Sequence, residues 1–447
     1  MVLAVIIVFA ILAGYVVTSS QMLNQLSPVD TPAPAQTPTP SITPSPTATA
    51  TPTPAGVWSQ VQAARLFEQV EVQVERLREL SPQAGVPLSF ADQDQMERVL
   101  EAASEEDLEG RFLPYVLVGA LPRRPRSVDA EPVAGVYVPQ QEQLYIGTER
   151  SSEGADDQAL LAHAYAHVLQ NQHFDLRAKM ASVRSTDERL ALEALEEGDA
   201  QLLTALYRYG DLDSADWDHL AALTVRAEVP SYGSWVDESA FWTRVRRFPY
   251  REGRQFAQSL FLEGGWAEVN RAYADRPTST EQILHPERYL EERDRPTEVL
   301  VPALQTELDA DWQLVVRDTL GELVMAAFLD EYLPQSRAAA AAAGWDGDTL
   351  VAWENEAGEW VWIWRSVWDS PGEAAEFERA LVALMPQLQP PVESLDPPMG
   401  FSGSWWSTPD EDVAIARVAR HVAFVQASAL ELLEQAVAEL PEGGGAE

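Results

Sequence analysis

A run of proline, threonine, serine and alanine over residues 27–55 divides the chain into parts of different character. Proline fixes φ and lacks an amide donor, so a segment this rich in proline favours an extended polyproline II conformation and cannot build a packed core. We therefore expect residues 21–56 to form a disordered stalk, with the folded part beginning near Val57.

The segment before the stalk is apolar. Residues 2–17 carry no charged side chain. As a helix rising about 1.5 Å per residue they would cover roughly 24 Å of a ~30 Å hydrocarbon core, which Thr18, Ser19 and Ser20 extend. There is no clear small-residue cleavage site and no cysteine for a lipoprotein signal. We expect residues 1–20 to be a retained single-pass anchor with the folded part outside the membrane; the alternative is a cleaved signal peptide and a secreted protein.

Composition excludes several classes of protein. Acidic residues number 70 against 31 basic ones, a formal net charge of -39, and such a surface repels nucleic-acid backbones. Cysteine is absent, which excludes disulfides, thiolate metal ligands and thiol nucleophiles. Any metal site must therefore be built from histidine, aspartate and glutamate.

Apolar periodicity predicts an α+β fold that is mostly helical. Spacings of three and four predict helices over residues 57–80, 91–120, 157–183 and 186–209. Two β-rich runs, residues 134–138 and 143–147, flank a Pro-Gln-Gln turn and predict a hairpin.

The last third contains a weak internal repeat of two ββα units. The predicted strands cover residues 349–354, 360–368, 413–417 and 421–426, and the helices residues 372–384 and 427–440. We expect a small antiparallel sheet covered by helices on one face, with the tryptophan-rich strand in its middle. The predicted domains are a helical one over residues 57–335 and the ββα region, residues 336–447, packed on it.

The residues with a chemical signal lie in LLAHAYAHVLQNQHFDL, residues 160–176. His163 and His167 are four apart, and on a helix this spacing places both imidazoles on one face, where they can share a cation. A structural histidine pair is the alternative.

A third ligand is available in the next helix. Glu197 lies thirty residues beyond His167, and Gly198 after it would let the histidine helix approach closely. Glu193 and Glu196 compete for this role, and all three carboxylates would also suit a solvated helix face.

Residues 132–384 resemble a family of bacterial extracytoplasmic proteins with an HExxH zinc-peptidase motif. That family carries a stretch like LAHEYTHALQDQHFDL, which here is LAHAYAHVLQNQHFDL, and an ALxEGDA motif, matched by ALEEGDA at residues 194–200. Further shared blocks cover residues 248–289, 318–329 and 341–353. The resemblance implies a zincin-like helical metallopeptidase core and zinc held by His163, His167 and Glu197.

The chain departs from that family at Ala164, where HExxH has glutamate. That glutamate takes a proton from the zinc-bound water and passes it to the leaving amine, and losing such a group costs ~10²–10⁴ in rate. Ala166 replaces a threonine and Val138 an aspartate of the family pattern. We expect a pseudopeptidase that retains zinc and binds an unidentified peptide or protein at the cell surface. An active peptidase using Glu193 or Glu196 as base, and a surface domain without metal, remain alternatives.

Two further histidines bear on the site. In related zinc peptidases a histidine or tyrosine donates to the developing oxyanion, a role open to His285. Its alternative is a turn residue before Pro286. His173, six residues beyond His167, is turned to another helix face and is not expected to be a ligand.

Overall fold

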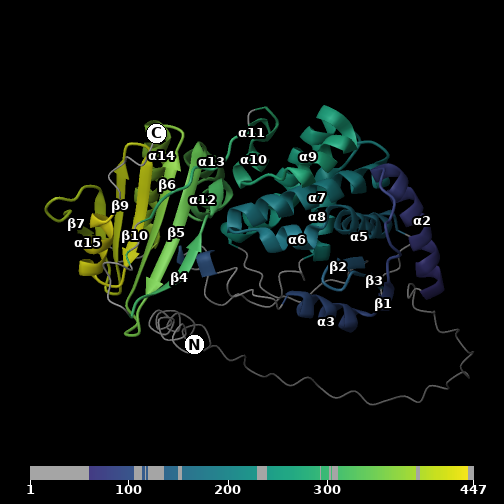
Figure 1. Ribbon diagram of the computed structural model, residues 1–447, viewed down its shortest axis with the longest axis horizontal. Helices are drawn as coiled ribbons and strands as arrows, with labels where there is room; N and C mark the ends of the chain where they lie inside the picture. Colours follow the sequence, from purple (N-terminus) through teal and green to yellow (C-terminus); the bar gives the residue numbers. More distant parts are fainter. Residues whose placement is uncertain are drawn as a thin grey trace, which may run out of the picture.

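The computed structural model describes residues 60–104, 113–115, 117–118, 135–148, 154–228, 239–291, 293–301, 304, 311–388 and 393–440. Within these ranges no helix is both long and apolar enough to cross a bilayer. The expected anchor, residues 1–20, and the stalk, residues 21–56, lie outside the described part of the chain. The fold is α+β, with a helical part followed by a part built on an antiparallel sheet (Figure 1).

The helical part is arranged around three long helices, α5, α7 and α9, with α2 packed against α5 and α7. Its helices are α2 (Gln60–Arg78), α3 (Gln93–Ser104), α5 (Ala155–Phe174), α6 (Leu176–Ser182), α7 (Thr186–Tyr209), α8 (Trp217–Glu228), α9 (Ala240–Ala274), α10 (Thr280–Leu284) and α11 (Glu287–Leu290). The helix predicted at residues 186–209 is confirmed, and the one predicted at residues 57–80 is confirmed over Gln60–Arg78. α9 is interrupted at Gly264 and Gly265, whose backbones are not helical.

The single helix predicted over residues 157–183 is wrong, because the chain breaks at Asp175 into α5 and α6. Asp175 adopts a left-handed backbone (φ 49, ψ 54), and its side chain accepts a hydrogen bond from the amide of Ala178 to cap α6. Aspartate tolerates this conformation better than most residues. The apolar spacing runs through the break, so periodicity gave no signal of it.

The predicted hairpin is confirmed. β2 (Gly135–Val138) pairs antiparallel with β3 (Gln143–Gly147), and β1 (Leu88–Ala91) adds parallel to β3. β2 also packs on α5: a Cβ placed on Gly135 would lie 2.9 Å from the Leu161 side chain and 3.9 Å from the Cβ of Ala164.

The C-terminal part is a seven-stranded antiparallel sheet in the order β4-β5-β6-β10-β9-β8-β7. It contains the four predicted strands, β5, β6, β9 and β10, and is larger than expected because short strands extend both edges. The sheet starts at β4, upstream of the boundary expected at residue 335. The strands are β4 (Gln313–Asp318), β5 (Trp345–Glu354), β6 (Trp360–Trp368), β7 (Glu393–Leu395), β8 (Ser404–Ser407), β9 (Asp412–Val418) and β10 (His421–Ala427).

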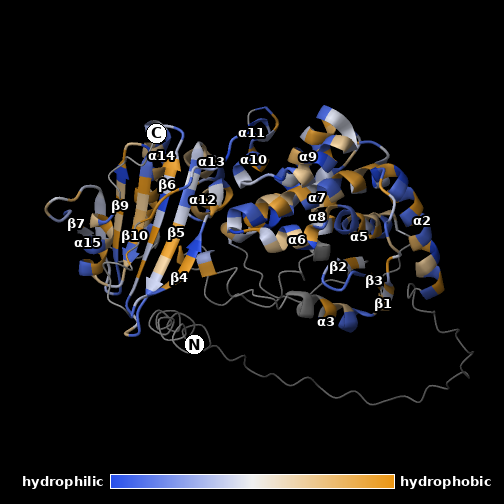
Figure 2. Ribbon diagram, in the orientation of Figure 1, coloured by the Kyte–Doolittle hydropathy of each residue, from blue (hydrophilic) through white to orange (hydrophobic). Residues whose placement is uncertain are grey.

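The expectation that helices cover one face of this sheet is wrong, because α14 (Pro371–Leu388) and α15 (Leu430–Ala438) pack on opposite faces. Trp362 and Trp364 of β6 share a core with α14, whereas Val361 and Ile363 of the same strand share one with α15. Because β6 is apolar on both faces, each face needs a cover. Figure 2 shows hydrophobic residues along these central strands.

A buried aspartate joins the sheet to α12 (Gly321–Asp330). Asp348 of β5 accepts hydrogen bonds from the backbone amides of Leu320 (3.0 Å) and Gly321 (2.9 Å). The indoles of Trp345 (3.0 Å) and Trp364 (2.9 Å) donate to the same carboxyl group. α12 packs in turn on α9 and on α13 (Gln335–Ala342), so one core runs through both parts.

A second buried aspartate, at the start of α7, stabilises the junction between the helical part and the sheet. Asp187 accepts hydrogen bonds from the Thr280 amide (2.8 Å) and hydroxyl (2.5 Å), and its own amide donates to the Thr319 carbonyl oxygen (3.0 Å). Burial raises the pKa of Asp187 to about 8 despite the hydrogen bonds from Thr280, which lower it. Burial also raises the pKa of Asp348 to about 6. Burial therefore favours the neutral form of the Asp187 carboxyl group in the folded chain.

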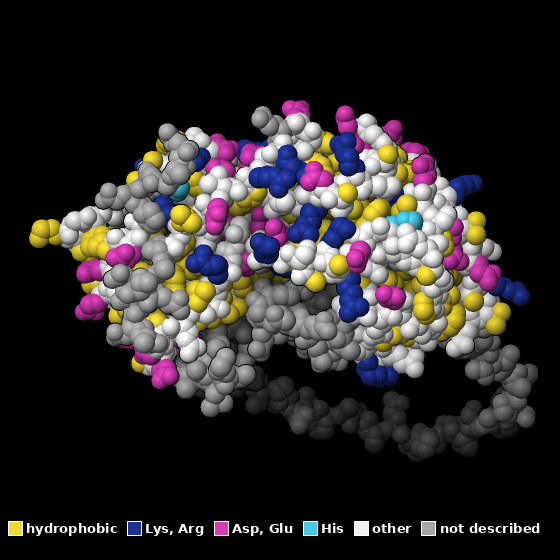
Figure 3. Space-filling model, viewed as in Figure 1, with side chains coloured by type: hydrophobic (Ala, Val, Ile, Leu, Met, Phe, Trp, Pro, Cys, Tyr) yellow, Lys and Arg dark blue, Asp and Glu magenta, His cyan; other side chains and the backbone are white. Residues whose placement is uncertain are grey.

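The surface mixes charges of both signs. Figure 3 shows Lys and Arg side chains among acidic ones on the face it presents. Several arginines are held in ion pairs, such as Arg276 with Glu188 and Arg288 with Glu281.

α7 and α9 touch backbone to backbone. A Cβ on Gly198 would lie 2.1 Å from the carbonyl oxygen of Gly253, and a Cβ on Gly253 would lie 2.3 Å from that of Ala194. The expectation that Gly198 admits the histidine helix is therefore wrong, since it admits α9. Neighbouring residues on a helix point about 100° apart, and here Gly198 faces α9 whereas Glu197 faces α5.

We predict that Gly198→Ala destabilises the protein by about 1–3 kcal/mol, because the added methyl meets the α9 backbone, which has no side chain to move aside. Urea or thermal unfolding measures the change. Gly85→Ala is the control, since nothing lies within 4 Å of a Cβ at that position. Equal stability of the two variants would contradict the close crossing.

We predict a pH-dependent contribution from Asp187. Its pKa is raised on folding, so the stability it contributes is complete below the unfolded value of about 3.9 and is lost as pH rises through the folded value of about 8. Between pH 5 and 7 the free energy of unfolding should fall more steeply for the natural chain than for Asp187→Asn, by up to about 1.4 kcal/mol per pH unit. Urea titrations at several pH values test this, and parallel slopes would refute it.

Candidate metal centre

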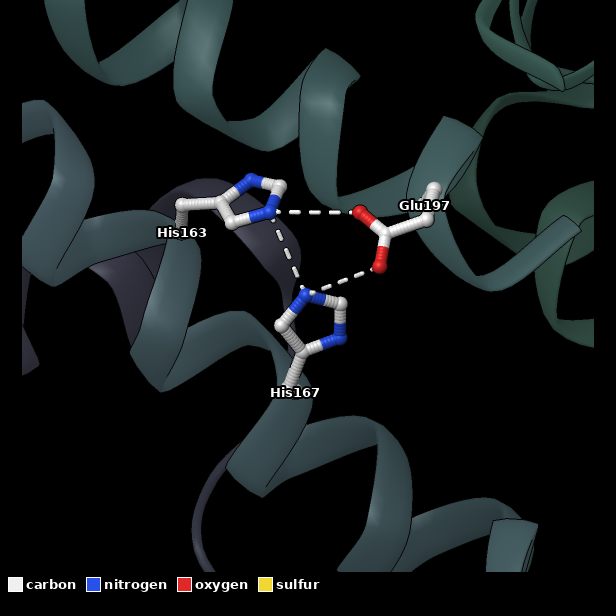
Figure 4. Close-up of side chains that lie close together, drawn as sticks. All are labelled: His163, His167 and Glu197. Atoms are coloured by element: carbon white, nitrogen blue, oxygen red, sulfur yellow. Dashed lines mark hydrogen bonds and ion pairs between the residues drawn. The ribbon is translucent and has the colours of Figure 1, made fainter. Parts of the chain in front are cut away.

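α5 and α7 bring together the three predicted ligands (Figure 4). The Nε2 atoms of His163 and His167 lie 3.2 Å apart. Oε2 of Glu197 lies 3.3 Å from Nε2 of His163, and Oε1 lies 3.6 Å from Nε2 of His167. All the ligand atoms of this group lie within 4.8 Å of one another. Of the three candidate glutamates, Glu197 is the one that faces both histidines.

Hydrogen bonds to the opposite ring nitrogens orient both imidazoles. Nδ1 of His163 lies 3.2 Å from the Thr204 hydroxyl, which itself donates to the Ala200 carbonyl oxygen (2.6 Å) and so accepts from the ring. Nδ1 of His167 lies 2.9 Å from Oε1 of Gln170. This network assigns the hydrogen of each ring to Nδ1 and leaves both Nε2 lone pairs directed at Glu197.

The donor set fits a divalent cation. Two nitrogen lone pairs and a carboxylate at these distances favour a positive charge among them. In a tetrahedral zinc site with Zn–N bonds of ~2.0–2.1 Å, two ligand nitrogens lie roughly 3.3 Å apart, close to the separation of the two Nε2 atoms. His163 is buried, whereas the side chains of His167 and Glu197 are 12% and 15% exposed. Solvent therefore reaches the group from the side of these two residues.

No carboxylate lies at the position after the first histidine. Ala164 is buried where α5 packs against Gly135 of β2. The two glutamates considered as substitute bases have other contacts. Oε1 of Glu193 accepts from Arg189 (2.9 Å), and Oε1 of Glu196 lies 3.5 Å from Nδ1 of His167. Neither contact directs a carboxylate at the Nε2 atoms.

The structure places the other two histidines elsewhere. Nε2 of His285 lies 3.1 Å from both carboxylate oxygens of Glu322 in α12, and these hydrogen bonds raise the pKa of His285. Its neighbour α10 contacts Asp187, about 15 Å along α7 from Glu197 at 1.5 Å per residue. The oxyanion role suggested for His285 at this site stays a prediction. His173 donates to the Ser81 carbonyl oxygen (2.7 Å), in agreement with its exclusion as a ligand.

Sequence reasoning missed the residues around the ligands. Gln170 donates through Nε2 to Oδ2 of Asp199 (3.0 Å), and Asp199 forms a buried ion pair with Arg78. Gln170 could have been found, since it lies three residues after His167 on the same helix. Nothing in local spacing indicates Arg78, which is 121 residues from Asp199.

Comparison with known proteins bears on the sheet alone. Residues 312–436 match a family described as a domain of unknown function (DUF8575). This match contains the seven-stranded sheet and excludes the histidine group. No curated protein and no solved structure matches the chain.

Proposed function

We propose that this protein is a membrane-tethered extracytoplasmic relative of the zinc metallopeptidases that binds zinc without hydrolysing peptides. The observation that carries the proposal is the convergence of two oriented imidazoles and Glu197 beside a buried alanine. His163, His167 and Glu197 would hold the zinc ion, and the other residues at the site keep these ligands in place.

The missing activity follows from the chemistry of Ala164. A bound zinc ion would supply Lewis acidity and lower the pKa of a bound water. Proton transfer from that water to a leaving amine needs a general base within hydrogen-bond reach. A methyl group provides none, and Glu193 and Glu196 have the contacts described above. Binding of a peptide or protein at the cell surface is the role that remains.

The tether is part of the proposal and rests on sequence. An apolar segment, residues 2–17, followed by the proline-rich residues 27–55 favours a folded domain held away from the outer face of a membrane. Protease added to intact cells that express the chain tests this, since digestion of the folded part requires that it be outside.

We predict that the purified chain binds close to one zinc ion per molecule and that His163→Ala loses it, because the variant removes the buried ligand. Metal analysis after loading and dialysis measures the stoichiometry. His219→Ala is the control, since His219 pairs with Asp156 outside the group. Absence of zinc from the natural chain would leave a structural surface domain without metal.

We predict that Ala164→Glu gains peptide hydrolysis of ~10²–10⁴-fold over the natural chain, because it restores the general base. The double variant with His163→Ala should lose this gain. Some loss of stability accompanies the change, since the new carboxyl group enters the packed contact between α5 and β2. Equal hydrolysis of a casein substrate by the natural chain and Ala164→Glu would contradict the proposal and favour a substitute base.

A further inference from the structure

A chain of buried hydrogen bonds connects His167 to α2. Oε1 of Gln170 accepts from Nδ1 of His167 (2.9 Å), and Nε2 of Gln170 donates to Oδ2 of Asp199 (3.0 Å). Arg78 of α2 donates to both oxygens of Asp199, from Nε (2.7 Å) and Nη2 (3.0 Å). Gln170, Asp199 and Arg78 are each 1% exposed.

The orientation of the Gln170 amide group is fixed by the hydrogen-bond acceptors around it. Nε2 of Gln170 faces two acceptors, Oδ2 of Asp199 and the carbonyl oxygen of Glu196 (2.9 Å). A flipped amide would present its oxygen to both of these acceptors and its NH₂ group to His167. Asp199 therefore holds the Gln170 oxygen toward His167, which keeps the ring hydrogen on Nδ1 and leaves the Nε2 lone pair directed at Glu197.

Arg78 is itself fixed by α9. Its guanidinium lies 4.3 Å from the ring centroid of Trp266 and donates to Asn270 (2.7 Å), while the Tyr273 hydroxyl donates to Asp199 (2.9 Å). A buried ion pair is often no more stabilising than well-packed apolar residues, so stability alone does not account for it. The ion pair with Arg78 instead holds the Asp199 carboxylate in a fixed position, where it accepts a hydrogen bond from Gln170.

We infer that Gln170, Asp199 and Arg78 are positioning residues for the metal centre and that they couple metal binding to the docking of α2. The inference rests on the proposed function, since it takes His167 as a zinc ligand. Coupling of this kind is reciprocal: α2 docking raises metal affinity by the factor by which metal raises α2 docking. By the same coupling, displacement of α2, which follows the proline-rich segment in the sequence, would weaken metal binding.

The test uses the full chain with zinc as the probe. Chelator competition gives the zinc Kd, and hydrogen exchange gives the protection of residues 60–78 with and without zinc. Gln170→Met should weaken zinc binding ~10–100-fold and abolish the zinc-dependent protection of α2. Gln201→Met is the matched control, since Gln201 is as buried and bonds Thr224 of α8 instead (2.5 Å). It should keep the natural Kd and protection.

The outcomes separate the inference from the proposed function. If the natural chain binds zinc and Gln170→Met matches Gln201→Met in Kd and in α2 protection, the coupling is refuted and the zinc site stands. If the natural chain binds no zinc, the proposed function fails and the inference fails with it. Should Gln170→Met not fold, Arg78→Lys carries the test, because it keeps the charge and loses the paired hydrogen bonds. An unchanged Kd and unchanged α2 protection in that variant overturn the coupling.

Discussion

The contact between α7 and α9 at Gly198 and Gly253 sets the orientation of the side chains in the candidate centre. Helix geometry turns successive side chains by about 100°, so fixing Gly198 against α9 also fixes its two neighbours. Glu197 then faces the histidines of α5, and Asp199 faces Arg78 and Gln170. A larger residue at 198 would separate α7 from α9 and disturb both contacts together.

The candidate metal centre is a polar network enclosed by an apolar core. This burial explains why its side chains are held by hydrogen bonds. Buried donors and acceptors are costly unless paired, so each ring nitrogen that does not face Glu197 has a partner, Thr204 or Gln170. Ala164 belongs to the apolar side of this arrangement, where α5 meets β2. In the proposed function the site keeps its ligands and their supports while the proton-transfer group is absent.

The two parts of the fold share one core, and carboxyl groups hold the junction. Asp348 ties α12 to the sheet, and Asp187 ties α7 to the first residue of α10. Each is buried, and burial raises the pKa of each, so the junction is sensitive to pH. The metal centre lies further along α7, where hydrogen bonds to the ligands come from residues of α5 and α7.

Local spacing in the sequence determined several of the helices and strands and which of their residues share a face. It determined α7, the hairpin, the four central strands, and the pairing of His163 with His167, because these depend on periods of 3.6 and 2 within one segment. It could not identify the ligand among Glu193, Glu196 and Glu197, and it could not identify the helix that packs against Gly198. Both depend on how the helices are rotated against one another. Tertiary packing alone decided that α14 and α15 cover opposite faces of the sheet. It also decided the ion pair between Arg78 and Asp199. Residues 121 positions apart meet only when the whole core has formed, and no local pattern encodes that contact.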